Sequence, residues 1–431
     1  MNGTINGGEE RNEELQSAEE ESADESAVEE PRPVGFRDRI GCYTWTWFTM
    51  TMATGGIANV LHSIPYRSDW LRILGVVVFC FNLCLFFMNC TLLSLRFRWN
   101  PGSFLHSFLS PSESLCGTIL INMCQYGIPE TGVWFQTTMQ VCFWMYASVA
   151  VLASASIYLI IWSTQTFPIH TMTPIWIFPA YPLLLTAPFA ANLIDALPSA
   201  AAASRINSLT IALAAICLQG TGFLVSLMVL SAFIYRLMTQ KIPRETTRPG
   251  MFVSVGPSGF TVAGIVHLGN IVSTKIMPDG YMGNPSAGFF FKILADVSGL
   301  WMWGLCLWFF LVSVGAHLHL IYLSGQPEHH IHFDMTWYSF VFPNTAMITA
   351  TQAVGMTFEV RAIQILGTVM GVLLVLVWFF VFGMMVRAFL QKKLLWPNDD
   401  ASKEIQKISN VIEKTPTQSS ALRTRRVNLA C

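Results

Sequence analysis

The chain contains about ten long apolar runs, and glycine or proline interrupts several alternate members of the series. A break in a spanning helix frees backbone N–H and C=O groups, which cannot be left in hydrocarbon, so such a break must be buried in protein or face water. The pattern therefore predicts a membrane protein whose interrupted helices line a path. The interruptions are Thr54-Gly55-Gly56, Pro179/Pro182/Pro188, Gly256-Pro257-Ser258-Gly259 and Phe342-Pro343.

Composition agrees with a membrane protein and excludes several other classes. Hydrophobic residues fill 53% of the 431 positions and charged residues only 12%, about half the roughly 25% that is typical of soluble proteins. The net charge of -1 shows none of the excess of basic residues that is typical of proteins that bind nucleic acid. The ten cysteines show no CxxC pair and no regular spacing, so we predict neither a disulfide framework nor a metal site, and we expect no cofactor.

The lengths of the apolar runs predict the fold class. A spanning helix needs about 20 mainly apolar residues, and ten segments approach this length. We predict an all-α polytopic membrane protein with a transport domain over residues 41–392, an acidic disordered tail over 1–40 and a flexible tail over 393–431. The expected spans are residues 43–62, 72–95, 111–128, 134–162, 173–194, 206–236, 250–273, 287–321, 335–356 and 362–390.

Basic residues near the helix ends predict the orientation. Cytoplasmic loops carry an excess of lysine and arginine, so the richer side is the cytoplasmic one. We therefore expect both termini in the cytoplasm, as an even number of spans requires. The side shared by the termini has Arg37, Arg39, Arg96, Arg98, Arg236, Lys241, Arg244, Arg248, Arg387, Lys392 and Lys393, and the opposite side has Arg67, Arg72, Arg205, Lys275 and Arg361.

Consecutive spans pair into five helical hairpins, whose two members differ in composition. The second members are more uniformly apolar and suit contact with lipid. The first members carry the breaks and small polar side chains, so we expect them to form an inner ring around a central pore. The residues expected along the substrate path are Thr54, Gly55, Gly56, Asn59, Asn122, Thr186, Gly256, Pro257, Ser258, Gly259, His267, Pro343 and Asn344.

Three motifs in order give the chain a resemblance to a known family. They are Trp45-Thr46-Trp47-Phe48-Thr49-Met50-Thr51-Met52-Ala53-Thr54-Gly55-Gly56, Ser254-Val255-Gly256-Pro257-Ser258-Gly259-Phe260 and Trp337-Tyr338-Ser339-Phe340-Val341-Phe342-Pro343. Over residues 40 to 390 the chain resembles the tellurite-resistance/dicarboxylate transporters, which include plant slow anion channels and fungal malic acid transporters. The resemblance implies five hairpins around a pore, a homotrimer in the plasma membrane, and a pore-occluding phenylalanine on the ninth helix. Here that residue is Phe340 or Phe342, and the sequence does not decide between them.

The predicted pore favours anions. The inner helices have no charged side chain near their midpoints, whereas a cation path normally has acidic rings. Broken helices present N-terminal N–H groups whose partial positive charge favours carboxylates. The resemblance narrows the substrate to malate and related C4-dicarboxylates, moved with or without protons. Malate that carries one proton loses less hydration than the dianion, so we expect faster transport at mildly acidic pH.

Other functions stay open beside dicarboxylate transport. One is transport of another small anion such as sulfite. A polytopic membrane enzyme would need paired carboxylates or an HExxH or GxSxG motif, and the sequence has none of these. A third is a receptor-like sensor without flux. The sequence also does not separate a proton-coupled carrier from a channel.

Three groups of ionisable residues each have two interpretations. His267 either contacts a carboxylate or carries a proton, or it simply bonds a neighbouring helix. Lys292 and Asp296 are four residues apart on one span, and we interpret them as a structural ion pair rather than a functional site. We interpret the histidines at 329, 330 and 332 as solvated loop residues rather than metal ligands.

Overall fold

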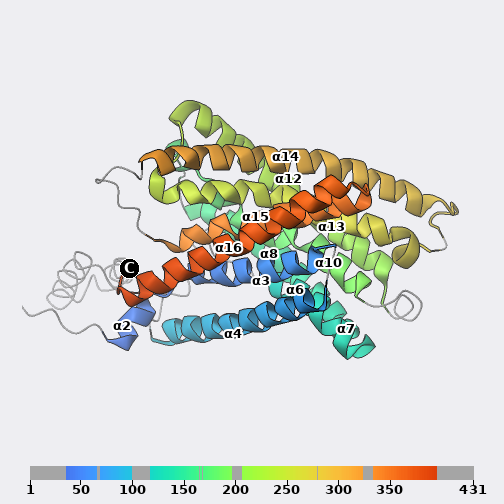
Figure 1. Ribbon diagram of the computed structural model, residues 1–431, viewed down its shortest axis with the longest axis horizontal. Coiled ribbons are helices and arrows are strands. Elements are labelled where there is room, and N and C mark those ends of the chain that lie inside the picture. The colour runs from blue at the N-terminus through green and yellow to red at the C-terminus, as the bar shows by residue number, and fades with distance from the viewer. Residues whose placement is uncertain are drawn as a thin grey trace, which may run out of the picture.

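The computed structural model describes residues 35–65, 68–99, 117–164, 166, 168–196, 206–278, 280–323 and 333–395. These residues form helices joined by short connections, and no β-strand occurs among them, as an all-α fold requires. Most helices run roughly along the long axis of the molecule (Figure 1).

Long outer helices alternate along the chain with shorter, interrupted segments. The most apolar stretch of each outer helix is only 22% to 33% buried inside the protein. Large apolar side chains such as Leu152, Trp301 and Phe379 are exposed on them, and a surface of this kind suits lipid. The outer helices are α4 (Asp69–Trp99), α8 (Val133–Thr164), α12 (Ser208–Gln240), α14 (Ala287–Leu323) and α16 (Arg361–Leu390).

The interrupted segments, called inner segments below, are mostly buried. The stretches Pro174–Asp195 and Thr247–Ile276 are 94% and 83% buried. Twelve of the sixteen residues of α3 and thirteen of the sixteen of α15 are buried as well. The inner segments are η1 (Trp45–Trp47) with α3 (Phe48–Ser63); α6 (Gly117–Asn122), η2 (Met123–Gly127) and α7 (Ile128–Thr131); η4 (Pro174–Ala180), α9 (Tyr181–Leu184) and α10 (Thr186–Asp195); η5 (Glu245–Val255), α13 (Gly256–Ile271) and η6 (Val272–Ile276); and η7 (Met335–Phe340) with α15 (Phe342–Thr357).

The inner segments contact one another in a closed cycle. Helix α3 contacts α15, α15 contacts α13, α13 contacts α10, α10 contacts α6, and α6 contacts α3. Glycine sets the closest approach: a Cβ at Gly259 of α13 would lie 2.8 Å from the carbonyl carbon of Ala346 on α15. One at Gly264 would lie 2.8 Å from the nitrogen of Pro188 on α10. Small residues at these crossings allow the backbones of membrane helices to pack closely.

Four of the inner segments change from a 3₁₀-helix to an α-helix part-way along. Helix α13 begins at Gly256 directly after η5, and α15 begins at Phe342 one residue after η7. Pro257 and Pro343 lie in the first turns of these helices, where a missing N–H costs no intrahelical bond. The predicted breaks at these positions are therefore real changes of helix type.

Outer helices supply hydrogen-bond partners for the break in the third inner segment. Gln219 of α12 accepts a bond from the nitrogen of Ala187 at 3.1 Å, and Tyr146 of α8 donates to the oxygen of Pro182 at 2.7 Å. Gln219 is fully buried. Backbone groups freed by the break are thus satisfied inside the protein.

Seven helical stretches within the described residues are long and apolar enough to cross a membrane. They are the outer helices together with Pro174–Asp195 and Thr247–Ile276. The other three predicted spans correspond to α3 and α15, which have 16 residues each, and to the α6–α7 segment, which the π-helix η2 interrupts. Ten spans in five hairpins therefore stay a prediction.

The two described ends of the chain lie at the same end of the molecule. Short helix α2 (Phe36–Gly41) and the C-terminal end of α16 are both at the left of Figure 1, while α7 and α10 lie toward the right. Residues 36–40 of the predicted acidic tail belong to α2. Residues 1–34 and 396–431 of the two predicted tails lie outside the described residues, and so do the histidines at 329, 330 and 332.

Candidate functional site

Three aromatic side chains from different inner segments meet near the start of α15. The ring centroid of Phe342 lies 5.3 Å from that of Phe260 on α13 and 5.6 Å from that of Tyr181 on α9. All three side chains are buried, and the Tyr181 hydroxyl donates to the oxygen of Val253 at 2.7 Å. This aromatic cluster joins three inner segments close to the N-terminal ends of α13 and α15.

Phe340, the other candidate for the gate, packs in a different place. Its ring centroid lies 5.5 Å from that of Phe252 on η5 and 5.2 Å from that of His317 on the outer helix α14. Phe340 is only partly buried. The two phenylalanines therefore have different surroundings. Phe342 packs among inner segments, and Phe340 packs toward an outer helix.

The predicted path residues of α3 and α6 take part in contacts between helices. Thr54 accepts a hydrogen bond from the indole nitrogen of Trp378 on α16 at 3.2 Å. The side-chain nitrogen of Asn122 donates to the oxygen of Gly55 at 2.9 Å. Gly56 packs against α15, where a Cβ would clash with a threonine side chain. These residues hold neighbouring inner segments together, and their place along a path stays a prediction.

The predicted residues at the starts of α10, α13 and α15 mostly bond within their own segments. The hydroxyls of Thr186 and Ser258 donate to backbone oxygens three residues earlier, at 2.7 and 3.3 Å. The side-chain nitrogen of Asn344 donates to a backbone oxygen four residues earlier at 2.8 Å. Gly256, Pro257, Gly259 and Pro343 supply backbone at these helix starts. Their contact with a substrate also stays a prediction.

Polar side chains gather near the C-terminal ends of the inner segments. Gln125 of η2 donates from one amide nitrogen to the side-chain oxygens of Asn59 on α3, at 2.6 Å, and of Asn192 on α10, at 3.1 Å. Gln125 is buried, whereas the two asparagines are partly exposed. One amide thus links three inner segments.

A carboxylate and two basic side chains form a second group at this end. Lys275 Nζ of η6 lies 2.7 Å from Asp195 Oδ1, and His267 Nε2 of α13 lies 3.1 Å from Asp195 Oδ2. Lys275 also donates to the backbone oxygen of Asp195 at 2.9 Å. The side chains of Asp195, His267 and Lys275 are 42%, 30% and 13% exposed. Each carboxylate oxygen therefore has its own partner, at a site open to solvent.

A third group corrects one of the predictions. Lys292 Nζ of α14 donates to Asn270 Oδ1 of α13 at 2.6 Å, and Asn270 Nδ2 donates to Thr357 of α15 at 2.8 Å. Lys292 and Asp296 do not form the close ion pair that was predicted, because the lysine bonds Asn270 on the adjacent helix, although the two charges still attract one another. Asp296 is buried, and its Oδ1 makes no hydrogen bond.

We call these three polar groups together the polar mouth, and they take residues from every inner segment and from α14. Only His267 and Asn59 among them were predicted as path residues. The remaining residues could have been found from their position in the sequence, because each inner segment carries a polar or charged side chain close to its C-terminal end. The residues of the polar mouth are Asn59, Gln125, Asn192, Asp195, His267, Asn270, Lys275, Lys292 and Thr357.

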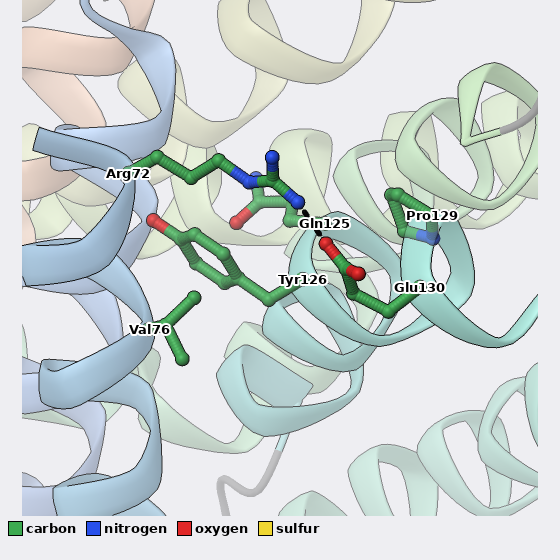
Figure 2. A pocket seen from close by; sticks show the side chains of 6 residues that line it. All are labelled: Arg72, Val76, Gln125, Tyr126, Pro129 and Glu130. Atoms are coloured by element: carbon green, nitrogen blue, oxygen red, sulfur yellow. Dashed lines mark hydrogen bonds and ion pairs between the residues drawn. The ribbon is translucent and has the colours of Figure 1, made fainter. Parts of the chain in front are cut away.

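A separate pocket of about 280 Å³ adjoins the polar mouth through Gln125. Figure 2 shows the side chains of Arg72 from α4 and Glu130 from α7 pointing toward one another across it, with Tyr126 alongside. Both charged side chains are at least half exposed, so their ion pair contributes little to stability. No group of three His, Cys, Asp or Glu side chains gathers to hold a metal within the part of the chain that the structure describes.

Comparison with known proteins identifies the family. The model of the voltage-dependent anion channel family, SLAC1, matches residues 42–386, which is most of the chain. The protein belongs to this family. It is therefore an anion transport protein of the membrane, and the resemblance found in the three motifs is confirmed.

Individual relatives of this anion channel family member are named as transporters or pumps. A malic acid transport protein of Schizosaccharomyces pombe is 26% identical over 377 residues, which cover 85% of this chain and 83% of the relative. The sulfite efflux pump SSU1 of Trichophyton rubrum is 25% identical over 359 residues, which cover 81% of this chain and 91% of the pump. An uncharacterized transporter of Methanocaldococcus jannaschii is 25% identical over 327 residues, which cover 75% of this chain and 87% of the relative.

Proposed function

We propose that this protein moves malate and related C4-dicarboxylates across the plasma membrane, along the axis of the closed cycle of inner segments. The cycle is the observation that supports the proposal, because five mostly buried, interrupted segments contact one another in a closed ring. Helices α3, α13 and α15 contain no Arg, Lys, Asp or Glu. A cation path would need acidic side chains there.

Helix starts beside the aromatic cluster favour an anion on this axis. The first turns of α13 and α15 lie at helix ends that carry partial positive charge. Pro257 and Pro343 have no N–H, and the N–H of Gly256 donates to the oxygen of Val253, so only part of each first turn can offer a donor. Transporters use such internal helix N-termini to bind carboxylates. We propose that the substrate meets the predicted path residues of these first turns, which are Gly256 to Gly259 together with Pro343 and Asn344.

Phe342 is the proposed gate. Its side chain packs with Phe260 and Tyr181 from two other inner segments, which supports Phe342 as the residue that occludes the proposed path. Phe340 packs toward α14 and becomes a matched control. Opening then consists of moving the Phe342 ring away from its two aromatic partners.

The proposed membrane arrangement is ten crossings in five hairpins. In it α3, the α6–α7 segment and α15 cross the membrane as short helices shielded by the outer helices. The common end for α2 and α16 in Figure 1 agrees with an even number of crossings. Both termini are proposed to be cytoplasmic, the protein to form a homotrimer, and protons to accompany malate when the monoanion is carried.

Sulfite is the second candidate substrate, because the sulfite efflux pump is about as similar to this chain as the malic acid transport protein. Tracer flux into vesicles that hold the purified protein decides between them, with L-malate, succinate, lactate and sulfite tested separately. We expect labelled malate to exchange against internal malate or succinate, and lactate to exchange weakly. Sulfite flux with no malate flux would overturn the proposal.

A further inference from the structure

Asp195 is held as the carboxylate of a substrate would be held. Its two oxygens meet different basic side chains, Lys275 at 2.7 Å and His267 at 3.1 Å, and the carboxylate itself is 42% exposed. Lys275 is much less exposed and is fixed by its further bond to the backbone oxygen of Asp195. The basic groups are therefore positioned by the fold, while the carboxylate between them is accessible from solvent.

Helix polarity makes the carboxylate the replaceable member of this group. Asp195 is the last residue of α10, and a helix C-terminus carries partial negative charge that disfavours an acidic side chain and favours a lysine. Lys275 would stay bonded to the backbone oxygen at this helix end if the Asp195 side chain turned away. Removal of the Asp195 carboxylate thus leaves a positive site that remains organised.

A second cation lies on the same side of α13. His267 and Asn270 are three residues apart and therefore neighbours on one face of the helix. Asn270 accepts a hydrogen bond from Lys292, so this lysine reaches the face that carries His267. The polar mouth consequently offers two positive centres, Lys275 beside His267 and Lys292 beside Asn270, as a molecule with two carboxylates requires.

We propose that the polar mouth is a docking site for a dicarboxylate anion, and that Asp195 occupies half of this site as a tethered competitor when no substrate is bound. One substrate carboxylate takes the place of Asp195 against Lys275 and His267, and the other bonds to Lys292. This inference rests on the proposed function, since it names the first site that the transported dicarboxylate meets.

Equilibrium binding of tritiated L-malate to the purified full-length protein tests the site without any need for flux. A tethered group competes at a high effective concentration, so Asp195→Asn should lower the dissociation constant for malate by about three- to tenfold. Lys275→Gln should raise it by about fivefold, the size expected for a partly exposed charge pair. In the double variant the gain from Asp195→Asn should disappear, because the competition acts through Lys275.

Controls separate a specific site from a general field and from misfolding. Glu130→Gln removes the same charge at the same end of the molecule but in the separate pocket, so it should leave the dissociation constant unchanged. Lys292→Gln should weaken competition by unlabelled succinate more than competition by lactate, which has one carboxylate. Lys275→Arg keeps the charge and should bind malate if Lys275→Gln unfolds.

The outcomes distinguish this inference from the proposed function. Unchanged or weaker malate binding in a folded Asp195→Asn variant would overturn the docking site, even where the wild type carries malate. An equal gain in Glu130→Gln would do the same. Tighter binding in Asp195→Asn together with no malate flux would instead support the site and overturn the transport proposal.

Discussion

Replacement of Phe342 with alanine removes the ring that packs between two other inner segments. The ring makes two aromatic contacts, with centroids 5.3 and 5.6 Å apart, and each such contact contributes about 0.5–1.5 kcal/mol. The closed arrangement would thus lose about 1–3 kcal/mol. Because about 1.4 kcal/mol corresponds to a factor of ten, we expect basal flux to rise by roughly fivefold to 150-fold.

Vesicles that hold purified protein provide the assay. Efflux of labelled malate is followed from equal amounts of wild type and Phe342→Ala, after gel filtration shows that both proteins are folded. Phe340→Ala is the matched control, since it deletes the same side chain two residues earlier but at a position packed against α14. We expect Phe340→Ala to change efflux by less than about twofold, because its aromatic contacts lie outside the cluster.

Two results would refute this reasoning. Unchanged efflux in a folded Phe342→Ala variant would show that the aromatic cluster does not restrict the path. Equal increases in both variants would show that loosening of this region, rather than removal of a specific ring, raises the flux. A rise in Phe260→Ala as well as in Phe342→Ala would support the cluster as the barrier.

Three other predictions concern packing, a helix break and pH. Gly259→Ala should destabilise the protein by about 1–3 kcal/mol through overpacking against α15. Gly304→Ala is the control, because a Cβ there meets no atom within 4 Å and should not destabilise the protein. Equal thermal unfolding temperatures for the two variants would contradict this prediction. Gln219→Leu should cost about 1–3 kcal/mol, since it leaves the Ala187 N–H without a partner, and an unfolding temperature like that of wild type would argue against it. Initial malate uptake should be faster at mildly acidic pH than at neutral pH, and a flat profile from acid to neutral would count against carriage of the monoanion.

Much of the architecture was predictable because backbone chemistry constrains membrane helices strongly. Gly56, Ser258 and Pro343 are all buried, as the need to satisfy a broken helix in protein requires. The contrast between buried inner and exposed outer helices followed from their composition. The length criterion does not select α3 and α15, which have 16 residues each and are mostly buried among their neighbours.

The detail of the site depended on geometry that local sequence does not contain. Phe340 ends a 3₁₀-helix and Phe342 begins an α-helix, so the directions of their side chains depend on the backbone of the break between them. Asp296 lies four residues from Lys292 in the same helix. Lys292 nevertheless bonds Asn270, because α13 packs against α14. Asp195 and Lys275 are 80 residues apart, and only the closed cycle brings their segments together.

The same packing limits how the proposed gate can move. Gly259 of α13 lies so close to the backbone of Ala346 on α15 that no methyl group fits between them. Tilting α13 against α15 would break this contact. Shifting α10 would break the bond between Gln219 and the Ala187 N–H and expose a backbone donor in a nonpolar environment. Rotation of the Phe342 ring breaks neither contact, although it separates this buried ring from the aromatic rings of Phe260 and Tyr181. Movement of this side chain therefore disturbs the packing of the inner segments least. We expect Phe342→Ala to raise flux even though deletion of this buried ring also costs about 3–5 kcal/mol of stability.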